Sequence, residues 1–147
     1  MKTITHILIQ KGREIWTTSP EATVFEALQV MAAKDVGALP VLEGKKLVGI
    51  FSERDYARKV ILKGKSSKKI PVREIMSAHL VTISPDQTNE QGLALMTARH
   101  IRHLPVLQDQ KLVGFISIGD LVKSIIDEQK QVIDKLEQYI IETTGLN

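Results

Sequence analysis

A segment of 46 residues occurs twice in this chain, and this duplication limits the fold more than any other feature. Residues 15–60 align without a gap with residues 80–125, and 17 of the aligned positions carry the same residue. A unit of this size cannot easily bury its own apolar face. We therefore expect the two copies to pack together about a pseudo-twofold axis, with paired clefts at their junction where ligands bind.

Composition narrows the class of protein. The chain has 147 residues, 43% of them hydrophobic, which suffices for one ordinary core shared by two half-domains. It has no cysteine, so disulfides, thiol nucleophiles and cysteine-ligated metal centres are excluded. The first residues do not have the pattern of a signal peptide, and no apolar run approaches the roughly 18 residues of a membrane span. The sequence predicts a soluble, cytoplasmic protein.

The positive charge has a local origin. The formal net charge is +3, and four lysines fall within residues 63–71, the Gly- and Ser-containing stretch that joins the two copies. This stretch has no aromatic residue on which a base could stack. A solvated linker is therefore favoured over a phosphate-contacting loop, and neither nucleic acid nor a membrane is expected as a partner.

Both copies begin with the same predicted elements. Residues 15–18 and 80–83 are predicted as short strands, each ending at a Ser-Pro dipeptide that turns the chain. A helix follows, with Thr23 as its N-cap and Glu26 at the capping-box position in the first copy. Its apolar residues recur at helical spacing, and Met31 and its counterpart Met96 are assigned to core packing rather than to a redox or metal role.

A hairpin and a second helix complete each copy. Residues 38–42 and 46–52 predict the hairpin of the first copy, and residues 103–107 and 111–117 that of the second. An amphipathic run follows each hairpin. The order strand, helix, strand, strand, helix predicts an α/β (α+β) fold of two pseudo-twofold-related repeats packed sheet to sheet, with a mixed, helix-covered sheet.

The last helix breaks the symmetry between the copies. In the first copy it meets Gly64, whereas in the second the apolar spacing continues without glycine or proline up to Gly145. Apolar residues recur every seven positions along this extension. The extension either folds back on its own module or contacts a dimer mate or partner, and the second alternative is favoured. We divide the chain into a first repeat with its N-terminal segment and basic linker (residues 1–70), a second repeat (71–128) and a helical extension (129–147).

Each copy carries a Ser-x-x-Asp motif at the end of its hairpin. The pairs are Ser52 with Asp55 and Ser117 with Asp120. A capping box requires this pattern, because the serine oxygen accepts a backbone N–H and the carboxylate answers from the third helical position. The aspartate also suits a binding role, because two carboxylate oxygens match the two hydroxyl donors of a ribose and the helix N-terminus suits a phosphate. The sequence leaves both readings open.

The motifs together resemble a known family. Gly37-Ala38-Leu39-Pro40-Val41 and Arg102-His103-Leu104-Pro105-Val106, each followed by Leu-Val-Gly and Ser-x-x-Asp, closely resemble the CBS domain, named after cystathionine β-synthase. Two in tandem resemble a Bateman module, over roughly residues 3 to 127, of the small stand-alone type of bacteria and plant organelles. The resemblance implies a regulatory sensor of adenosine-containing ligands that often dimerises into a flat disc.

The resemblance also implies two sets of site residues. Asp55 and Asp120 are the ribose ligands, Ser52 and Ser117 lie near the ribose or phosphate, and Ile50 and Phe115 wall the base. The Asp55 cleft further uses Gly37, Ala38, Arg54 and Met76. The Asp120 cleft further uses Lys11, Thr17, Val36, Gly37, Arg102 and His103.

The two clefts are predicted to differ in chemistry. Arg102 and His103 stand where the first copy has Gly37 and Ala38, so the cationic groups come from different positions. For Arg102, His103 and Arg54, phosphate binding and simple surface placement are equally favoured.

No sequence pattern indicates a reaction. Metalloprotease, phosphate-loop and nucleophile-elbow motifs are missing, so we expect a non-enzymatic module without a metal. The expected ligand is AMP first and NAD next, with ADP and ATP as further candidates, and the expected partners are a second copy and a regulated protein. The alternatives are a purely structural interaction module, a nucleic-acid binder that uses the basic linker, and an enzyme acting on the bound nucleotide.

Overall fold

The computed structural model describes residues 1–145, which form two compact units. Unit one contains residues 1–13, residues 83–104 and the described residues from 116 onward, and unit two contains residues 14–82 and 105–115. Unit two therefore holds the whole first copy of the repeat, while unit one combines the N-terminal segment with both helices of the second copy.

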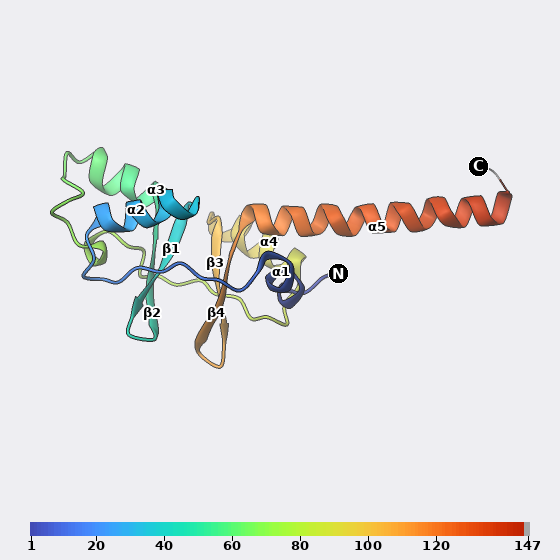
Figure 1. Ribbon diagram of the computed structural model, residues 1–147, viewed down its shortest axis with the longest axis horizontal. Coiled ribbons are helices and arrows are strands. Elements are labelled where there is room, and N and C mark those ends of the chain that lie inside the picture. The colour runs from blue at the N-terminus through green and yellow to red at the C-terminus, as the bar shows by residue number, and fades with distance from the viewer. Residues whose placement is uncertain (146–147) are drawn as a thin grey trace. The chain divides into compact units, whose positions relative to one another are not determined.

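Unit two has the predicted order of helix, hairpin and helix (Figure 1). Its elements are α2 (Val24–Lys34), β1 (Ala38–Glu43), β2 (Lys46–Ser52), α3 (Glu53–Tyr56), the π-helical turn η1 (Ala57–Ile61) and the 3₁₀ turn η2 (Val72–Glu74). The strands pair antiparallel, with a register shift between Val41 and Leu42.

Unit one is mainly helical. Its helices are α1 (Ile4–Lys11), α4 (Asn89–Arg99) and α5 (Ile118–Thr144). Residues 105–115 of the second hairpin, β3 (His103–Gln108) and β4 (Lys111–Ser117), belong to unit two. This hairpin turns through Asp109 and Gln110, both at positive φ as a two-residue hairpin loop of type I′ requires. The predicted α/β fold with a hairpin in each copy and a long C-terminal helix is confirmed.

The strands predicted at the start of each copy are wrong. Residues 15–18 and 80–83 form no strand, and Thr18 makes only an isolated parallel bridge with Val41. Two hydrogen bonds make this bridge: the Thr18 N–H donates to the Pro40 carbonyl, and the Leu42 N–H donates to the Thr18 carbonyl. Because Pro20 has no N–H to donate, the pairing cannot continue along the chain. The mixed sheet expected from the sequence is therefore a two-stranded antiparallel sheet with one parallel bridge.

The duplication extends to the backbone at helix ends. Thr23 and Thr88 cap α2 and α4 through capping boxes, with Glu26 and Gln91 as the answering side chains. Both helices end on a residue in the left-handed conformation at the equivalent position, Asp35 and His100, each with φ of 54°. The predicted helix starts are confirmed, and equivalent sequence produces equivalent local structure in both copies.

Each unit buries its own apolar residues. In unit two, Phe51 from β2 is fully buried among α2, β1 and the segment around η2. In unit one, Gly92 lets α4 approach α5, because a Cβ there would lie 3.2 Å from both methyl carbons of Leu121. Met31 and Met96 are 3% and 1% exposed, which confirms their assignment to the core.

Helix α5 continues beyond the packed part of unit one (Figure 1). Its first turns contact α1 and α4, but every residue from Gln129 to Gly145 is exposed. The alternative in which the extension folds back on its own module is therefore wrong. No helix among residues 1–145 combines the length and the apolar character needed to cross a membrane.

Replacing Phe51 with Ala will lower the free energy of unfolding by about 3 to 5 kcal/mol, because the side chain is fully buried and leaves a cavity. Denaturant unfolding measures the change. The matched control is Phe25→Ala in the same unit, where 37% of the side chain is already exposed, and it will cost clearly less. Equal losses at the two positions would contradict this packing.

Candidate functional site

Asp120 lies in the first turn of α5 and contacts Ser117, the N-cap of that helix, and Lys11. Its Oδ2 accepts a hydrogen bond of 2.8 Å from the Ser117 N–H, and the Ser117 Oγ accepts one of 3.2 Å from the Asp120 N–H. The same Oδ2 forms an ion pair of 2.6 Å with Nζ of Lys11, the last residue of α1. The capping role of Ser-x-x-Asp is therefore confirmed here, and Lys11 and Asp120, which the family resemblance assigned to one cleft, are in contact.

His103 carries the largest electrostatic perturbation near this aspartate. Desolvation by burial lowers the pKa of His103 from its usual 6.5 to about 4, and the charges of Lys11 and Arg102 lower it further while Asp120 raises it. The imidazole is therefore neutral at pH 7, and Lys11 and Arg102 supply the cationic charge of this group. Arg102 is exposed, and its carbonyl accepts the Ile118 N–H at 2.8 Å, which holds the start of α5 beside it.

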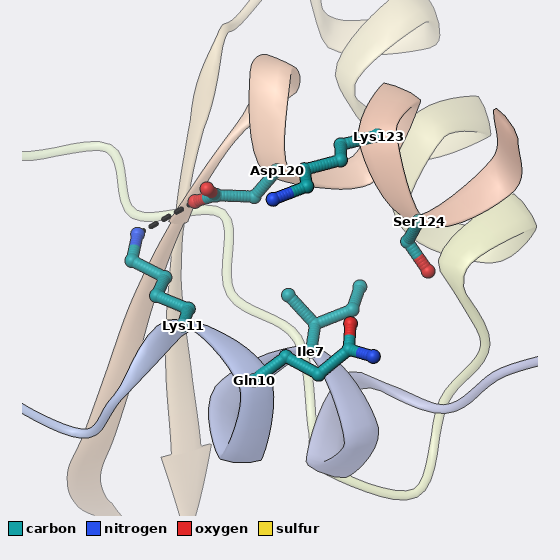
Figure 2. A pocket seen from close by; sticks show the side chains of 6 residues that line it. All are labelled: Ile7, Gln10, Lys11, Asp120, Lys123 and Ser124. Carbon is teal, nitrogen blue, oxygen red and sulfur yellow. Dashed lines mark hydrogen bonds and ion pairs between the residues drawn. The ribbon is translucent and has the colours of Figure 1, made fainter. Parts of the chain in front are cut away.

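A small pocket opens between α1 and α5 next to the ion pair (Figure 2). Its volume is about 180 Å³, below the range of about 300 to 1,000 Å³ typical of small-molecule sites. Two lysines and one aspartate contribute charge to its wall. The lining residues are Ile7, Gln10, Lys11, Asp120, Lys123 and Ser124. The pocket suits a polar fragment such as a ribose or phosphate group.

The remaining residues predicted for this cleft belong to unit two. Thr17 and Val36 are partly buried, and Phe115 lies in β4. Their grouping with Asp120 stays a prediction.

Asp55 is held more tightly than Asp120. Its Oδ2 accepts hydrogen bonds of 3.0 Å from both the N–H and the hydroxyl of Ser52, and its Oδ1 forms an ion pair of 3.3 Å with Lys59. Lys59 is itself anchored, since its Nζ donates to the Ile75 carbonyl at 3.1 Å. The Asp55 side chain is 12% exposed, against 25% for Asp120. Both carboxylate oxygens of Asp55 are thus engaged within the unit.

The predicted neighbours of Asp55 lie around the end of β2. Ile50 exchanges two backbone hydrogen bonds with Ser77, of 3.0 and 2.9 Å, which places the Met76 side chain against Gly49. A Cβ at Gly49 would lie 2.6 Å from the Met76 sulfur and 3.1 Å from the Ser77 carbonyl oxygen, so any side chain there would displace Met76. Met76 is therefore part of the packing beside the predicted site.

The first-copy counterparts of Arg102 and His103 are structural. Ala38 is buried and pairs with Ser52 across the hairpin, and the Gly37 carbonyl accepts the Glu53 N–H at 3.1 Å. Arg54 is exposed on α3. The structure thus brings Gly37, Ala38 and Ser52 together, and their role in binding stays a prediction.

Several residues of the Asp120 pocket were not predicted. Ile7 and Gln10 lie on α1, a helix that we did not predict from the sequence. Its signals were present: Thr3 as a cap, apolar residues at positions 4, 7 and 8, and Gly12 at positive φ after its end. Lys123 and Ser124 follow Asp120 by one turn of α5, so helical spacing from the recognised aspartate indicates them.

Groups suited to hold a metal ion are absent from residues 1–145. No cluster of three or more histidine, aspartate or glutamate side chains occurs there.

A model of the CBS domain family matches residues 11–62 and 72–127, which together make up most of the chain. The chain belongs to the CBS domain family. The mitochondrial CBS domain-containing protein CBSX3 of Arabidopsis thaliana is 37% identical over 94% of this chain and 71% of its own length. The CBS domain-containing protein YhcV of Bacillus subtilis is 37% identical over 74% of this chain and 76% of its own length.

Solved structures agree with the family. A protein with CBS domains from Burkholderia ambifaria is 47% identical, with a TM-score of 0.83 over 87% of this chain and 96% of that protein. The family resemblance and the tandem arrangement of two CBS domains are therefore confirmed. CBS pairs are regulatory modules, and the candidate site has to be interpreted in that setting. The mitochondrial relative leaves the cytoplasmic location a prediction.

The lowered pKa of His103 makes the CBS pair lose stability in acid. Between about pH 6.5 and pH 4 the unfolded chain takes up a proton that folded His103 does not, so the free energy of unfolding falls as pH falls, by at most about 3 kcal/mol. His103→Gln will flatten this part of the profile in urea unfolding measured from pH 7.5 to 4. The control is His79→Gln, which replaces an exposed histidine. If the His103→Gln profile keeps the wild-type slope, the desolvation of His103 is contradicted.

Proposed function

We propose that this CBS pair is a non-enzymatic sensor that binds an adenosine nucleotide at Asp120 and reports occupancy to a dimer mate or a partner protein. AMP is the first candidate, with NAD, ADP and ATP as further ligands. The observation that carries the proposal is the ion pair between Lys11 and Asp120 at the capped start of α5.

This ion pair combines the two groups that a nucleotide site needs, one for the ribose and one for the phosphate. A carboxylate accepts the two hydroxyls of a ribose, and an ammonium binds a phosphate. In the free protein the two groups neutralise each other at 2.6 Å. In the bound state the ribose hydroxyls donate to Asp120, and Lys11 turns to the phosphate. Arg102 adds a second cation, while neutral His103 offers a hydrogen bond rather than a charge.

The size of the pocket sets which part of the ligand it takes. About 180 Å³ between α1 and α5 accommodates a ribose or a phosphate but not a whole nucleotide. In our proposal the base lies outside this pocket.

A structural neighbour supports the choice of ligand class by analogy. A CBS domain pair with a TM-score of 0.74 was crystallised with 5′-methylthioadenosine and S-adenosyl-L-methionine. At 22% identity it shares the fold with this chain, so its ligands belong to that protein. What transfers is the proposal that an adenosine moiety fits such a fold.

We assign Asp120 as the principal site and Asp55 as the weaker one. Binding at Asp55 requires the Lys59 contact to Oδ1 and the Ser52 contacts to Oδ2 to be disrupted, and Lys59 also holds the Ile75 carbonyl. Breaking charge-assisted contacts in a half-buried setting opposes ligand entry. Asp120 Oδ2 also accepts a cap hydrogen bond, from the Ser117 N–H, and it forms the ion pair with Lys11. In our proposal the ligand displaces this ion pair and is then bound by Lys11 itself.

Helix α5 connects the proposed ligand site at Asp120 with a surface that a partner could bind. Asp120 lies in the first turn of α5, and the same helix continues to an exposed end. A ligand shifts an equilibrium only through a difference in affinity between two states. We propose that exchange of the Lys11 contact alters the packing of α1 on α5 and thereby the position of the exposed end.

A purely structural role is the second candidate, because both Ser-x-x-Asp motifs form complete capping boxes without any ligand. This role predicts a melting temperature that does not change on addition of AMP, ATP or NAD at millimolar concentration.

Asp120→Ala will weaken AMP binding at least tenfold in titration calorimetry, because the ribose loses its acceptor. Asp55→Ala is the matched control: it removes the same capping box in the other copy and will reduce affinity less. Melting curves of both variants measure the cost of losing the cap, which is about 0.5 to 2 kcal/mol in each. Unchanged AMP affinity in Asp120→Ala would rule out the ribose assignment.

Lys11→Met will remove the preference for AMP over adenosine. The wild-type protein binds AMP more tightly because Lys11 contacts the phosphate, whereas adenosine lacks that group. The affinity for adenosine will stay the same or rise, since the variant no longer neutralises Asp120. Lys111→Met, which removes an exposed lysine of β4, is the control and will keep the preference. A preference retained in Lys11→Met would assign the phosphate to another cation.

A further inference from the structure

The outer half of α5, residues 129–144, is an exposed helix with a continuous apolar face. Its large apolar side chains are about half exposed, from 40% for Ile141 to 64% for Tyr139. No described part of its own unit covers this segment. The segment also contains several β-branched residues, which have a low helix propensity. In proteins most of the stability of an amphipathic helix comes from packing of its apolar face. We therefore expect the apolar face to pack against another surface.

The apolar face consists of three columns with a seven-residue repeat. The central column runs through Val122, Gln129, Leu136 and Thr143. A side column lies on either side of it. The members of the side columns are Ile125, Val132 and Tyr139 on one side, and Ile126, Ile133 and Ile140 on the other. A strict seven-residue repeat is the pattern of helices that pack along their length on other helices.

Charged residues border this face on both sides. Along the helix, the charges alternate in sign on each border, and one border begins with a negative charge while the other begins with a positive one. The first border, next to the column of Val132, carries Glu128, Lys135 and Glu142. The second border, next to the column of Ile133, carries Lys130 and Glu137. Along the helix the signs therefore run minus, plus, minus on the first border and plus, minus on the second.

We propose that the outer half of α5 pairs in parallel and in register with the same segment of a second copy of this chain. In a parallel pair related by a twofold axis, the first border of one helix faces the second border of the other at nearly the same height. Lys135 then lies opposite Glu137 of the second copy, and Glu128 lies opposite Lys130 of the second copy. Each contact occurs twice, and all four are attractive.

The antiparallel arrangement reverses this pattern. Pairing about Leu136 places each border opposite itself, so that Lys135 meets Lys135 of the second copy and Glu137 meets Glu137 of the second copy. Like charges at such positions disfavour the pairing. Charge complementarity therefore selects both the partner and its orientation.

Gln129 supports the register. It is one of two polar residues of the central column, the other being Thr143 near the end of the helix. In the parallel pair it meets Gln129 of the second copy. In this register the two amides form a hydrogen bond with each other. In a register shifted by seven residues, the amide of Gln129 lies against Leu136 of the second copy and has no hydrogen-bond partner there. This inference concerns the far end of α5 and does not depend on nucleotide binding.

The chain has no cysteine, which permits a direct test with single-cysteine variants of the full chain. Gln129→Cys will form a disulfide-linked dimer under mild oxidation, because the two thiols meet in the central column. Gln131→Cys is the matched control, since it replaces the same residue type, is equally exposed and lies on the opposite side of the helix. In the antiparallel arrangement, residue 129 lies opposite residue 143 and the Gln129→Cys thiols stay apart.

A second measurement covers the case in which the cysteine variants fail to fold. Leu136→Asp will halve the mass measured by light scattering, whereas Gln138→Asp on the opposite side will leave it unchanged. Circular dichroism and thermal melting of each full-length variant show whether the protein stays folded. Lys135→Glu will weaken the assembly, and Lys135→Glu combined with Glu137→Lys will restore it.

Three results would overturn the proposal. They are a wild-type protein that is monomeric at micromolar concentration, equal crosslinking of Gln129→Cys and Gln131→Cys, and an unchanged mass of Leu136→Asp. Failure of nucleotide binding would leave all three measurements as they are, so the two proposals are tested separately.

Discussion

The capped first turn of α5 is the interaction on which the rest of the candidate site depends. The Asp120 carboxylate accepts the Ser117 N–H and thereby fixes where the longest helix begins, and the same oxygen binds the ammonium of Lys11. This one contact ties α1 to α5, borders the pocket and sets the charge beside His103. The ligand that we propose for this carboxylate would therefore act at the junction of the two helices.

The two copies of the repeat use the same motif with different neighbours. In both copies the capping box is complete, so Ser-x-x-Asp has a structural role whether or not it binds a ligand. The difference comes from the lysine partner. Lys59 is one turn away on the same helical segment and is anchored to the Ile75 carbonyl, whereas Lys11 comes from a separate helix at the other end of the sequence. Symmetric motifs thus pair one aspartate with a lysine of its own helical segment and the other with a lysine of a separate helix.

The local elements could be predicted well, and the errors have physical causes. Thr23 with Glu26 fixed a helix start, and the hairpins appeared within one residue of their predicted bounds, because caps and turns depend on nearby residues. Residues 15–18 read as a strand from their β-propensity, but a strand needs a partner, and Pro20 limits the pairing to one bridge at Thr18. Helix α1 was missed although its cap and apolar spacing were present, because it is short and its packing partner is more than 100 residues away.

By itself the sequence determined the duplication, the family, the caps and the amphipathic extension, since each of these is carried by residues close together in the chain. Only the tertiary structure decided which cation faces Asp120, that His103 is neutral, and that the outer half of α5 lies exposed. These properties depend on distances between segments far apart in the sequence and on burial, which sets the cost of a charge. Residue type and spacing name the groups of a site, but only packing determines their partners and their protonation.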